Sequence, residues 1–370
     1  MPLKQRCHPR EGGDPYPREF SVCRTMDSRF RGNDKAHISI WLFACAALVF
    51  LIVIIGGLTR LSESGLSIVS WQPVKGVIPP LDVRDWQNLF AAYKQTPQYL
   101  KINYDMSLEE FKNIFWLEYI HRVLGRIIGL VFLVPLLFFI ITKKIGKNLA
   151  LKLFSIALLG ALQGFIGWYM VKSGLVDNPA VSHYRLALHL FLGFVIYAML
   201  LWAGLNSAEC EVQSAEKATL NSALRTLHSL AISAFILFQT ILGAFVSGTH
   251  AGLIYNDFPL MGGHIIPEDI FFLHPLWLNF LQNPATIQFQ HRMMAFILFI
   301  LILIFRVKNP GDKAAGLLLA VALIQVLLGI LTLVNHVPVL FAAAHQAGAL
   351  VLFSVSLFIN YRLYAISQKS

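Results

Sequence analysis

Four histidines stand near the start of strongly apolar segments, where their side chains could hold a metal: His121, His189, His291 and His345. Histidine is the commonest metal ligand in proteins, and ionisable residues inside membrane-spanning segments tend to be functional because burying them in lipid is costly. For any one of them, hydrogen-bonded packing is the alternative role. Four at one depth, two in each half of the chain, favour a ligand role, and opposed imidazoles suit the axial positions of a haem iron.

A small residue follows each histidine by one helical turn: Gly125, Gly193, Ala295 and Ala349. Residues four apart share a helix face, so these positions leave room for a flat macrocycle beside each imidazole. Small residues also let membrane helices pack closely, which is the alternative. A zinc or copper site would need a third or fourth ligand. Glu118 could supply one in the first half, but only Gln288 stands at the matched place in the second, so haem fits better.

Arginines stand beside three of the histidines. Arg122 and Arg292 directly follow His121 and His291, and Arg185 lies one turn before His189. A guanidinium group pairs bidentately with carboxylates, including haem propionates. Long basic side chains near a membrane surface also extend toward water and anchor the helix there. Both roles stay open from the sequence.

Glu118 lies three residues before His121, so the two side chains share one helix face. A carboxylate there could accept protons or stabilise a cationic intermediate beside the cofactor. Its alternative role is to orient the histidine or to pair with Arg122. We favour the catalytic role because a buried carboxylate is expensive to keep in a membrane span. The second half has Gln288 instead, which predicts one reacting site in the first half and a related, non-reacting site in the second.

The elements that position these side chains are membrane spans. The chain has 370 residues, of which 56% are hydrophobic and 14% charged, and its mean hydropathy is +0.62. Soluble domains rarely have this composition. Helices of ~20 apolar residues cross the hydrocarbon layer, whereas the short alternating segments of a β-barrel are not found. The predicted spans are 38–58, 116–141, 149–171, 183–205, 222–246, 287–305, 314–334 and 339–361.

Basic residues indicate how these spans are oriented. Four lysines cluster between the second and third spans, whereas residues 246–290 contain no lysine or arginine. Basic residues concentrate on the cytoplasmic side, so we expect both termini in the cytoplasm and the long loops 59–115 and 247–286 on the outer side of the membrane. All four histidines then lie in the outer leaflet. The net charge of +10 therefore gives no indication of nucleic-acid binding.

Cysteines give no sign of a disulfide or a metal motif. The chain has only four, and none of them lies in an outward loop. A disulfide framework or a cysteine-based metal site is therefore not predicted. The four are Cys7, Cys23, Cys45 and Cys210.

The chain also repeats itself, as tandem structural units do. Three pairs of segments carry the match: 56–80 with 243–267, EYIHR at 118–122 with QFQHR at 288–292, and QGFIG at 163–167 with QVLLG at 325–329. We therefore predict an all-α integral membrane protein whose eight transmembrane helices form two tandem four-helix bundles, related by an internal pseudo-two-fold repeat. Four-helix bundles commonly hold cofactors between facing helices.

The predicted organisation has four parts. A polar, Gly- and Pro-rich stretch at 1–37 is expected to be a disordered cytoplasmic tail, because it has too little apolar surface to bury. The first bundle covers 38–206 and is the catalytic one. A cytoplasmic linker at 207–221 leads to the second bundle at 222–370.

These motifs together resemble the haem A synthase family, over about residues 38–365. The motifs that carry the resemblance are GGLTRLSESGLS at 56–67, EYIHR at 118–122, QGFIGWYMVKSGL at 163–175, HLFLGF from His189, QHR at 290–292 and HQ at 345–346. Some members of the family carry a pair of cysteines in their outward loops. A branch typical of proteobacteria and mitochondria has none there. This chain resembles that branch, which excludes a thiol relay in the loops as the electron route.

The resemblance implies an oxidoreductase that converts the C8 methyl group of haem O to the formyl group of haem A by two successive hydroxylations. It implies that His121 and His189 hold the substrate haem, that His291 and His345 hold a haem b, and that Glu118 is the family's essential glutamate. Haem O synthase and cytochrome c oxidase subunit 1 are the implied protein partners, beside the lipid bilayer. The sequence leaves open whether the chain forms a homo-oligomer.

Two alternatives compete with this interpretation. A di-haem electron carrier of the cytochrome b kind usually connects the two sides of a membrane, with haems at different depths, whereas these four histidines share one depth. A haem transporter is favoured by helices broken at mid-membrane, and the inner halves of the predicted spans look uninterrupted.

Overall fold

The computed structural model describes residues 24–70, 75–176, 179–208 and 220–367. Eight helices in this part are long and apolar enough to cross a membrane. The described residues form no strand beyond an isolated bridge between Met261 and His264. The eight-span, all-helical prediction is therefore confirmed. The spanning helices are α1 (Arg24–Leu61), α4 (Leu108–Ile141), α5 (Lys147–Ser173), α6 (His183–Ser207), α7 (Leu220–Gly248), α9 (Pro284–Lys308), α10 (Lys313–Val334) and α11 (Val339–Ser367).

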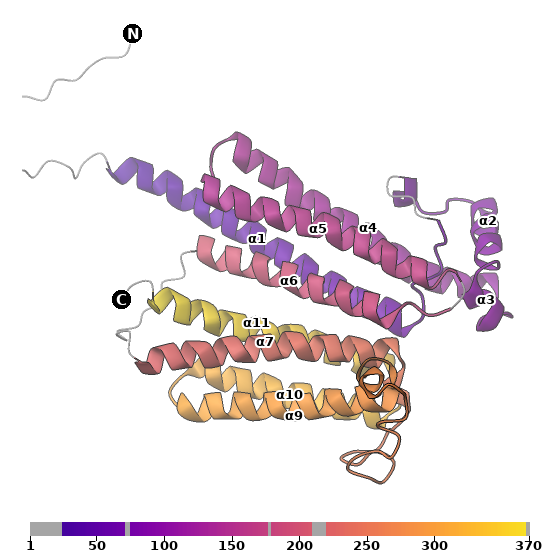
Figure 1. Ribbon diagram of the computed structural model, residues 1–370. Helices are drawn as coiled ribbons and strands as arrows, with labels where there is room; N and C mark the ends of the chain where they lie inside the picture. Colours follow the sequence, from indigo (N-terminus) through magenta and orange to yellow (C-terminus); the bar gives the residue numbers. More distant parts are fainter. Residues whose placement is uncertain (1–23, 71–74, 177–178, 209–219, 368–370) are drawn as a thin grey trace, which may run out of the picture.

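The spanning helices form two neighbouring groups of four (Figure 1). The helices α1, α4, α5 and α6 form the first group, and α7, α9, α10 and α11 form the second. The groups meet where α1 and α6 pack against α7 and α11. Across this seam the amide of Gln346 donates to the carbonyl of Val53 at 2.8 Å. The arrangement agrees with the predicted tandem bundles, whose repeat relation and boundaries stay predictions; most of the predicted linker lies outside the described residues.

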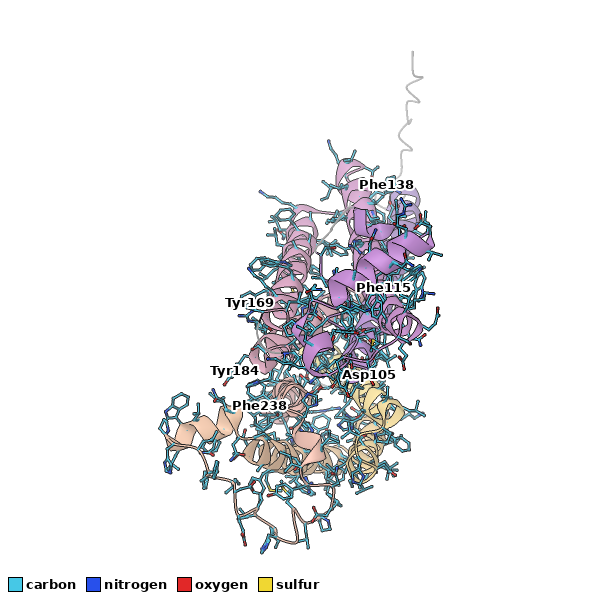
Figure 2. The ribbon with its side chains drawn as sticks, turned by 90° about the vertical axis from the view of Figure 1, so that its right-hand side faces the viewer. Asp105, Phe115, Phe138, Tyr169, Tyr184 and Phe238 are labelled. Carbon is cyan, nitrogen blue, oxygen red and sulfur yellow. The ribbon has the colours of Figure 1, made fainter. Side chains whose placement is uncertain are left out.

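The two long loops lie at one end of the bundle, hereafter the loop end, and the last described residues at both ends of the chain lie at the other (Figure 1). Helix α4 has 34 residues and is about 51 Å long, so its first turns project beyond a hydrocarbon layer of roughly 30 Å. The short helices α2 (Val83–Tyr93) and α3 (Pro97–Lys101) pack against this projection, where Phe111 and Phe115 are buried. Figure 2 looks onto this end and labels Phe115. The first loop is thus an ordered cap on α4.

The second loop is ordered by its own polar contacts. It contains three short helices: η2 (Ala251–Leu253), η3 (Leu276–Leu278) and α8 (Asn279–Gln282). The backbone N–H groups of Gly262 and Gly263 donate to the carboxylate of Asp257 and lower its pKa. These bonds therefore stabilise the loop at pH values above the ordinary pKa of aspartate. Their contribution is lost as the pH falls through the lowered pKa of Asp257. A further short helix, η1 (Lys75–Val77), belongs to the first loop.

The start of α1 differs from the prediction. Residues 24–37 were assigned to a disordered tail, but helix α1 begins at Arg24 and includes them. Once the apolar span has formed a helix, adding residues of ordinary helix propensity to its end requires no new nucleation. Asp34 in this extension pairs with Lys144 at 2.7 Å. The part of the predicted tail at 1–23 lies outside the described residues.

A buried ion cluster holds the second group together at the end opposite the loops. Asp312 caps α10, its side chain is only 8% exposed, and it pairs with Arg225 of α7 and Arg362 of α11. We expect Asp312→Ala to destabilise the protein by about 2 kcal/mol, because the two partly exposed arginines lose their shared carboxylate. Thermal unfolding in detergent measures the effect. Asp34→Ala is the control, since its more exposed pair with Lys144 should contribute little; equal losses would contradict the prediction.

Candidate functional site

Each of the four histidines faces a glycine on the neighbouring helix. A Cβ atom added to each glycine would meet the imidazole ring at 3.3 Å or less, so the absence of a side chain makes room for the ring. The pairs are Gly56 of α1 with His121 of α4 at 3.0 Å, Gly167 of α5 with His189 of α6 at 2.9 Å, Gly243 of α7 with His291 of α9 at 3.3 Å, and Gly329 of α10 with His345 of α11 at 2.9 Å.

Sequence reasoning missed these glycine partners. It examined small residues on the same helix as each histidine, whereas the contacts come from the preceding helix. The signal was present, because Gly56 aligns with Gly243 and Gly167 aligns with Gly329 in the repeated segments. The structure therefore gives the matched glycines a specific use beside the rings.

The same-helix glycines contact neighbouring side chains. A Cβ on Gly125 would lie 3.5 Å from Ile52, and one on Gly193 would lie 3.5 Å from the amide nitrogen of Gln163. These are ordinary packing distances, which agree with the close-packing role of small residues in membrane helices. That they provide clearance for a macrocycle stays a prediction.

The second histidine pair has the spacing that one metal ion between two imidazoles requires. The ring centroids of His291 and His345 are 6.4 Å apart. A metal–imidazole bond is about 2 Å long and the ring nitrogen lies roughly 1 Å from its centroid, so two opposed ligands have centroids roughly 6 Å apart. Nδ1 of His345 lies 3.1 Å from the carbonyl oxygen of Gln325, which can only accept. Nδ1 therefore carries the proton, and Nε2 keeps its lone pair for a metal. The residues present fit a haem.

Glutamines on neighbouring helices also contact three of the histidines. Gln163, Gln239 and Gln325 donate to the backbone carbonyl oxygens of His189, His291 and His345 at 3.0, 2.9 and 2.8 Å. Gln163 and Gln325 stand in the matched QGFIG and QVLLG segments, but sequence reasoning gave them no role. These bonds fix the position of the helix turn that presents each imidazole.

Glu118 is 2% exposed and accepts three hydrogen bonds. The donors are the hydroxyl of Ser67 at 2.6 Å, the backbone N–H of Ile68 at 2.9 Å and the guanidinium of Arg122 at 2.5 Å. A buried carboxylate requires such partners as an anion. The contact with Arg122 is the pairing that sequence reasoning held as the alternative role. Glu118 therefore fastens the loop that follows α1 to α4, next to His121, and its catalytic role stays a prediction.

The two arginines that follow a histidine fasten the long loops in corresponding ways. Arg122 donates to the carbonyl oxygen of Ile68 at 3.0 Å, and Arg292 donates to that of Tyr255 at 3.1 Å. Ile68 and Tyr255 align in the repeated segments 56–80 and 243–267. The matched contacts support the predicted repeat. Binding of propionates by these arginines stays a prediction.

Arg185 lies at the loop end between α5 and α6. It donates to the carbonyl oxygen of Tyr169 at 2.7 Å, and its guanidinium lies 3.6 Å from the centre of the tyrosine ring. This stacking holds the guanidinium group of Arg185 at one side of a cavity of about 540 Å³. Trp168 also lines this cavity. Figure 2 labels Tyr169.

No cluster of three or more His, Cys, Asp or Glu side chains suited to a metal ion occurs among the described residues. Glu118 in particular is already occupied by its three donors. The only cysteine that the structure describes, Cys45, is buried in α1 as a free thiol.

Gly167 provides a test of the packing around His189. We expect Gly167→Ala to weaken haem retention about tenfold, because its Cβ would lie 2.9 Å from the ring and displace it. Gly164→Ala on the same helix is the control, since a Cβ there meets nothing within 4 Å. Haem content per purified protein measures the difference. Equal haem content in both variants would show that the close approach is unimportant.

Comparisons with known proteins agree with these features. A model of the cytochrome oxidase assembly protein family matches residues 39–357. The haem A synthase of Nitrosospira multiformis is 52% identical over 335 residues, which cover 88% of this chain and 93% of the relative. The haem A synthase of Wolbachia pipientis wMel is 47% identical over 321 residues, with 87% and 91% covered. That of Agrobacterium fabrum is 43% identical, with 88% and 89% covered. The chain therefore belongs to the cytochrome oxidase assembly protein family, among relatives named haem A synthase.

Proposed function

We propose that this chain is a haem A synthase, an oxidoreductase that oxidises the C8 methyl group of haem O to the formyl group of haem A. Two successive hydroxylations of the methyl group give a gem-diol, and loss of water gives the aldehyde. The observation that carries the proposal is the asymmetry between the two histidine pairs. Both halves present two imidazoles, but only the first keeps a buried carboxylate beside them, as Glu118. The names of the relatives support the same reaction.

In the first half, His121 and His189 hold the substrate haem, whose own iron supplies the redox chemistry. The structure suggests how Glu118 acts there. Because Arg122, Ser67 and Ile68 satisfy its carboxylate, it contributes mainly as a fixed negative charge that stabilises positive charge developing nearby. Glu118 is 2% exposed, so bulk water is kept from its carboxylate.

In the second half, His291 and His345 hold a haem b that serves structure or electron transfer. Their 6.4 Å ring separation supports the assignment. Gln288 replaces the carboxylate, and its amide donates to the carbonyl oxygen of Tyr255 at 2.9 Å. It therefore fastens the loop without placing a charge beside the ligands. Arg292 donates to the same carbonyl oxygen. It can pair with a propionate when the loop moves and this hydrogen bond is released.

The protein spans the bacterial inner membrane, with both termini in the cytoplasm and the two long loops outside. The basic cluster between α4 and α5 and the lack of lysine and arginine over 246–290 support this orientation. Haem O synthase supplies the substrate, and cytochrome c oxidase subunit 1 receives the product. All four ligand histidines then lie in the outer leaflet.

Pigment extraction tests the proposed function. The protein is purified after co-expression with a haem O source, and its extracted haems are separated by reverse-phase chromatography. We expect haem b together with haem O or haem A. Haem b alone would contradict the synthase and favour the di-haem electron carrier instead.

A further inference from the structure

Three of the four ligand histidines are tethered by a glutamine from the preceding helix. The amide nitrogens of Gln163, Gln239 and Gln325 donate to the histidine carbonyl oxygens at 2.8 to 3.0 Å. The amide oxygens of the same side chains are buried and have no hydrogen-bond partner among the described residues. A buried unpaired oxygen is unfavourable, so an amide kept at three equivalent places indicates a specific use for its nitrogen.

The fourth histidine, His121, has no such tether. In the repeat alignment that pairs Gly56 with Gly243, the residue matched to Gln239 is Ile52. Ile52 points toward α4, since its Cδ1 atom lies 3.5 Å from the Cβ position of Gly125, one turn from His121. An aliphatic side chain cannot donate a hydrogen bond. Within the described ranges we find no hydrogen bond from another helix to the carbonyl or the ring of His121.

The missing tether has a consequence for ligand strength. Groups that hold a ligand from behind keep its lone pair aimed at the metal, and losing them typically weakens metal binding. His189, His291 and His345 are each fixed on two sides, by a glycine contact and by a glutamine bond. Among the described residues, His121 contacts Gly56, and its turn of α4 is held from the first loop by the bonds of Glu118 and Arg122, but no glutamine ties it to a neighbouring spanning helix. Its turn of α4 is therefore tied to a loop rather than to a packed spanning helix, and it can move with that loop more easily than the other three turns can move.

The geometry points to His121 as the releasable ligand of the substrate site, a role that rests on the proposed function. The iron–His121 bond breaks first, while tethered His189 keeps its hold, and this exchange lets substrate haem bind and product haem leave. The iron–His189 bond then breaks as product haem leaves, and both bonds form again when substrate haem binds, so two iron–nitrogen bonds change and no electrons are transferred. The second pair is tethered on both sides, as suits a haem that stays.

The pattern can be tested by supplying the missing tether. Ile52→Gln places at position 52 the side chain that the second half has at Gln239, and Ile52→Leu is the matched control. Each purified holoprotein, carrying haem O or haem A together with haem b, is mixed with excess apomyoglobin, and the loss of each haem is followed separately. We expect Ile52→Gln to slow loss of haem O and haem A about 3- to 10-fold, with haem b unchanged and Ile52→Leu within about twofold.

Removal of tethers gives the reverse test and does not depend on Ile52→Gln folding. Gln239→Ile should speed the loss of haem b alone, and Gln163→Leu should speed the loss of haem O and haem A alone. The low-spin signal of the first site in electron paramagnetic resonance, measured per bound haem, should weaken in Gln163→Leu and strengthen in Ile52→Gln, and general destabilisation does not produce the strengthening.

The outcomes separate the two proposals. If Ile52→Gln binds both haems but releases haem O at the wild-type rate, or if Gln163→Leu leaves that rate unchanged, His121 is not the releasable ligand and the proposed function stands. If the wild-type protein carries haem b alone after co-expression with a haem O source, the proposed function itself fails, and the inference fails with it.

Discussion

Glu118→Gln is expected to lower haem A formation about 100-fold or more, while the protein still folds and binds haem. A glutamine at this position can still accept from Ser67 and the N–H of Ile68, so the loop stays fastened to α4. Only the negative charge beside His121 is lost. The second half already has a glutamine at the matched position, Gln288, which shows that the fold accommodates one there.

The measurement is the ratio of haem A to haem O in cells that co-express haem O synthase. Glu110→Gln is the control, because Glu110 lies on the same helix but is exposed and only caps its start. It should leave the ratio unchanged. Normal haem A formation in Glu118→Gln would show that Glu118 holds the loop and Arg122 in place and has no catalytic role.

Alanine at His291 or His345 is expected to remove haem b and leave the substrate haem bound. Alanine at His121 or His189 is expected to do the converse. Each pair draws on different helices, α9 with α11 and α4 with α6, so a lost ligand affects its own site first. The haem types retained by each purified variant are read by extraction and chromatography.

His228→Ala is the matched control for these variants. His228 is a histidine of α7 that contacts the carbonyl oxygen of Leu301 at 3.0 Å, in a helix that carries no ligand. Its replacement should change neither haem. Loss of both haems in every histidine variant would contradict the assignment of one haem to each pair.

Much of the fold could be predicted from the sequence, because the membrane restricts it so strongly. Apolar segments of about the right length must become helices, since lipid offers no partners for the backbone. The ends of the helices were less predictable. Helix α1 begins at Arg24, well before its apolar run, and helices α2 and α3 occupy a loop in which the sequence analysis predicts no helix. Outside the lipid, tertiary contacts such as those of Phe111 decide local structure.

The site was predictable as a set of side chains but not as a set of contacts. Histidines in apolar segments stand out, because such residues are rare there. The glycine that faces each ring and the glutamine that tethers three of the four histidines lie on other helices, and the rotation of one helix against another cannot be read from one sequence. The arginines show the same limit: propionate binding and anchoring at the membrane surface both stay open for Arg122 and Arg292 from the sequence, and the structure shows both bonded to loop carbonyl oxygens.

The most direct test of the central claim is conversion of haem O in cells that make haem O but no haem A. When this chain is expressed there, extracted membranes should contain haem A, and expression of Glu118→Gln should leave haem O almost unchanged. If the wild-type protein is present in the membrane with both haem sites filled and haem O still accumulates without any haem A, the chain is not a haem A synthase.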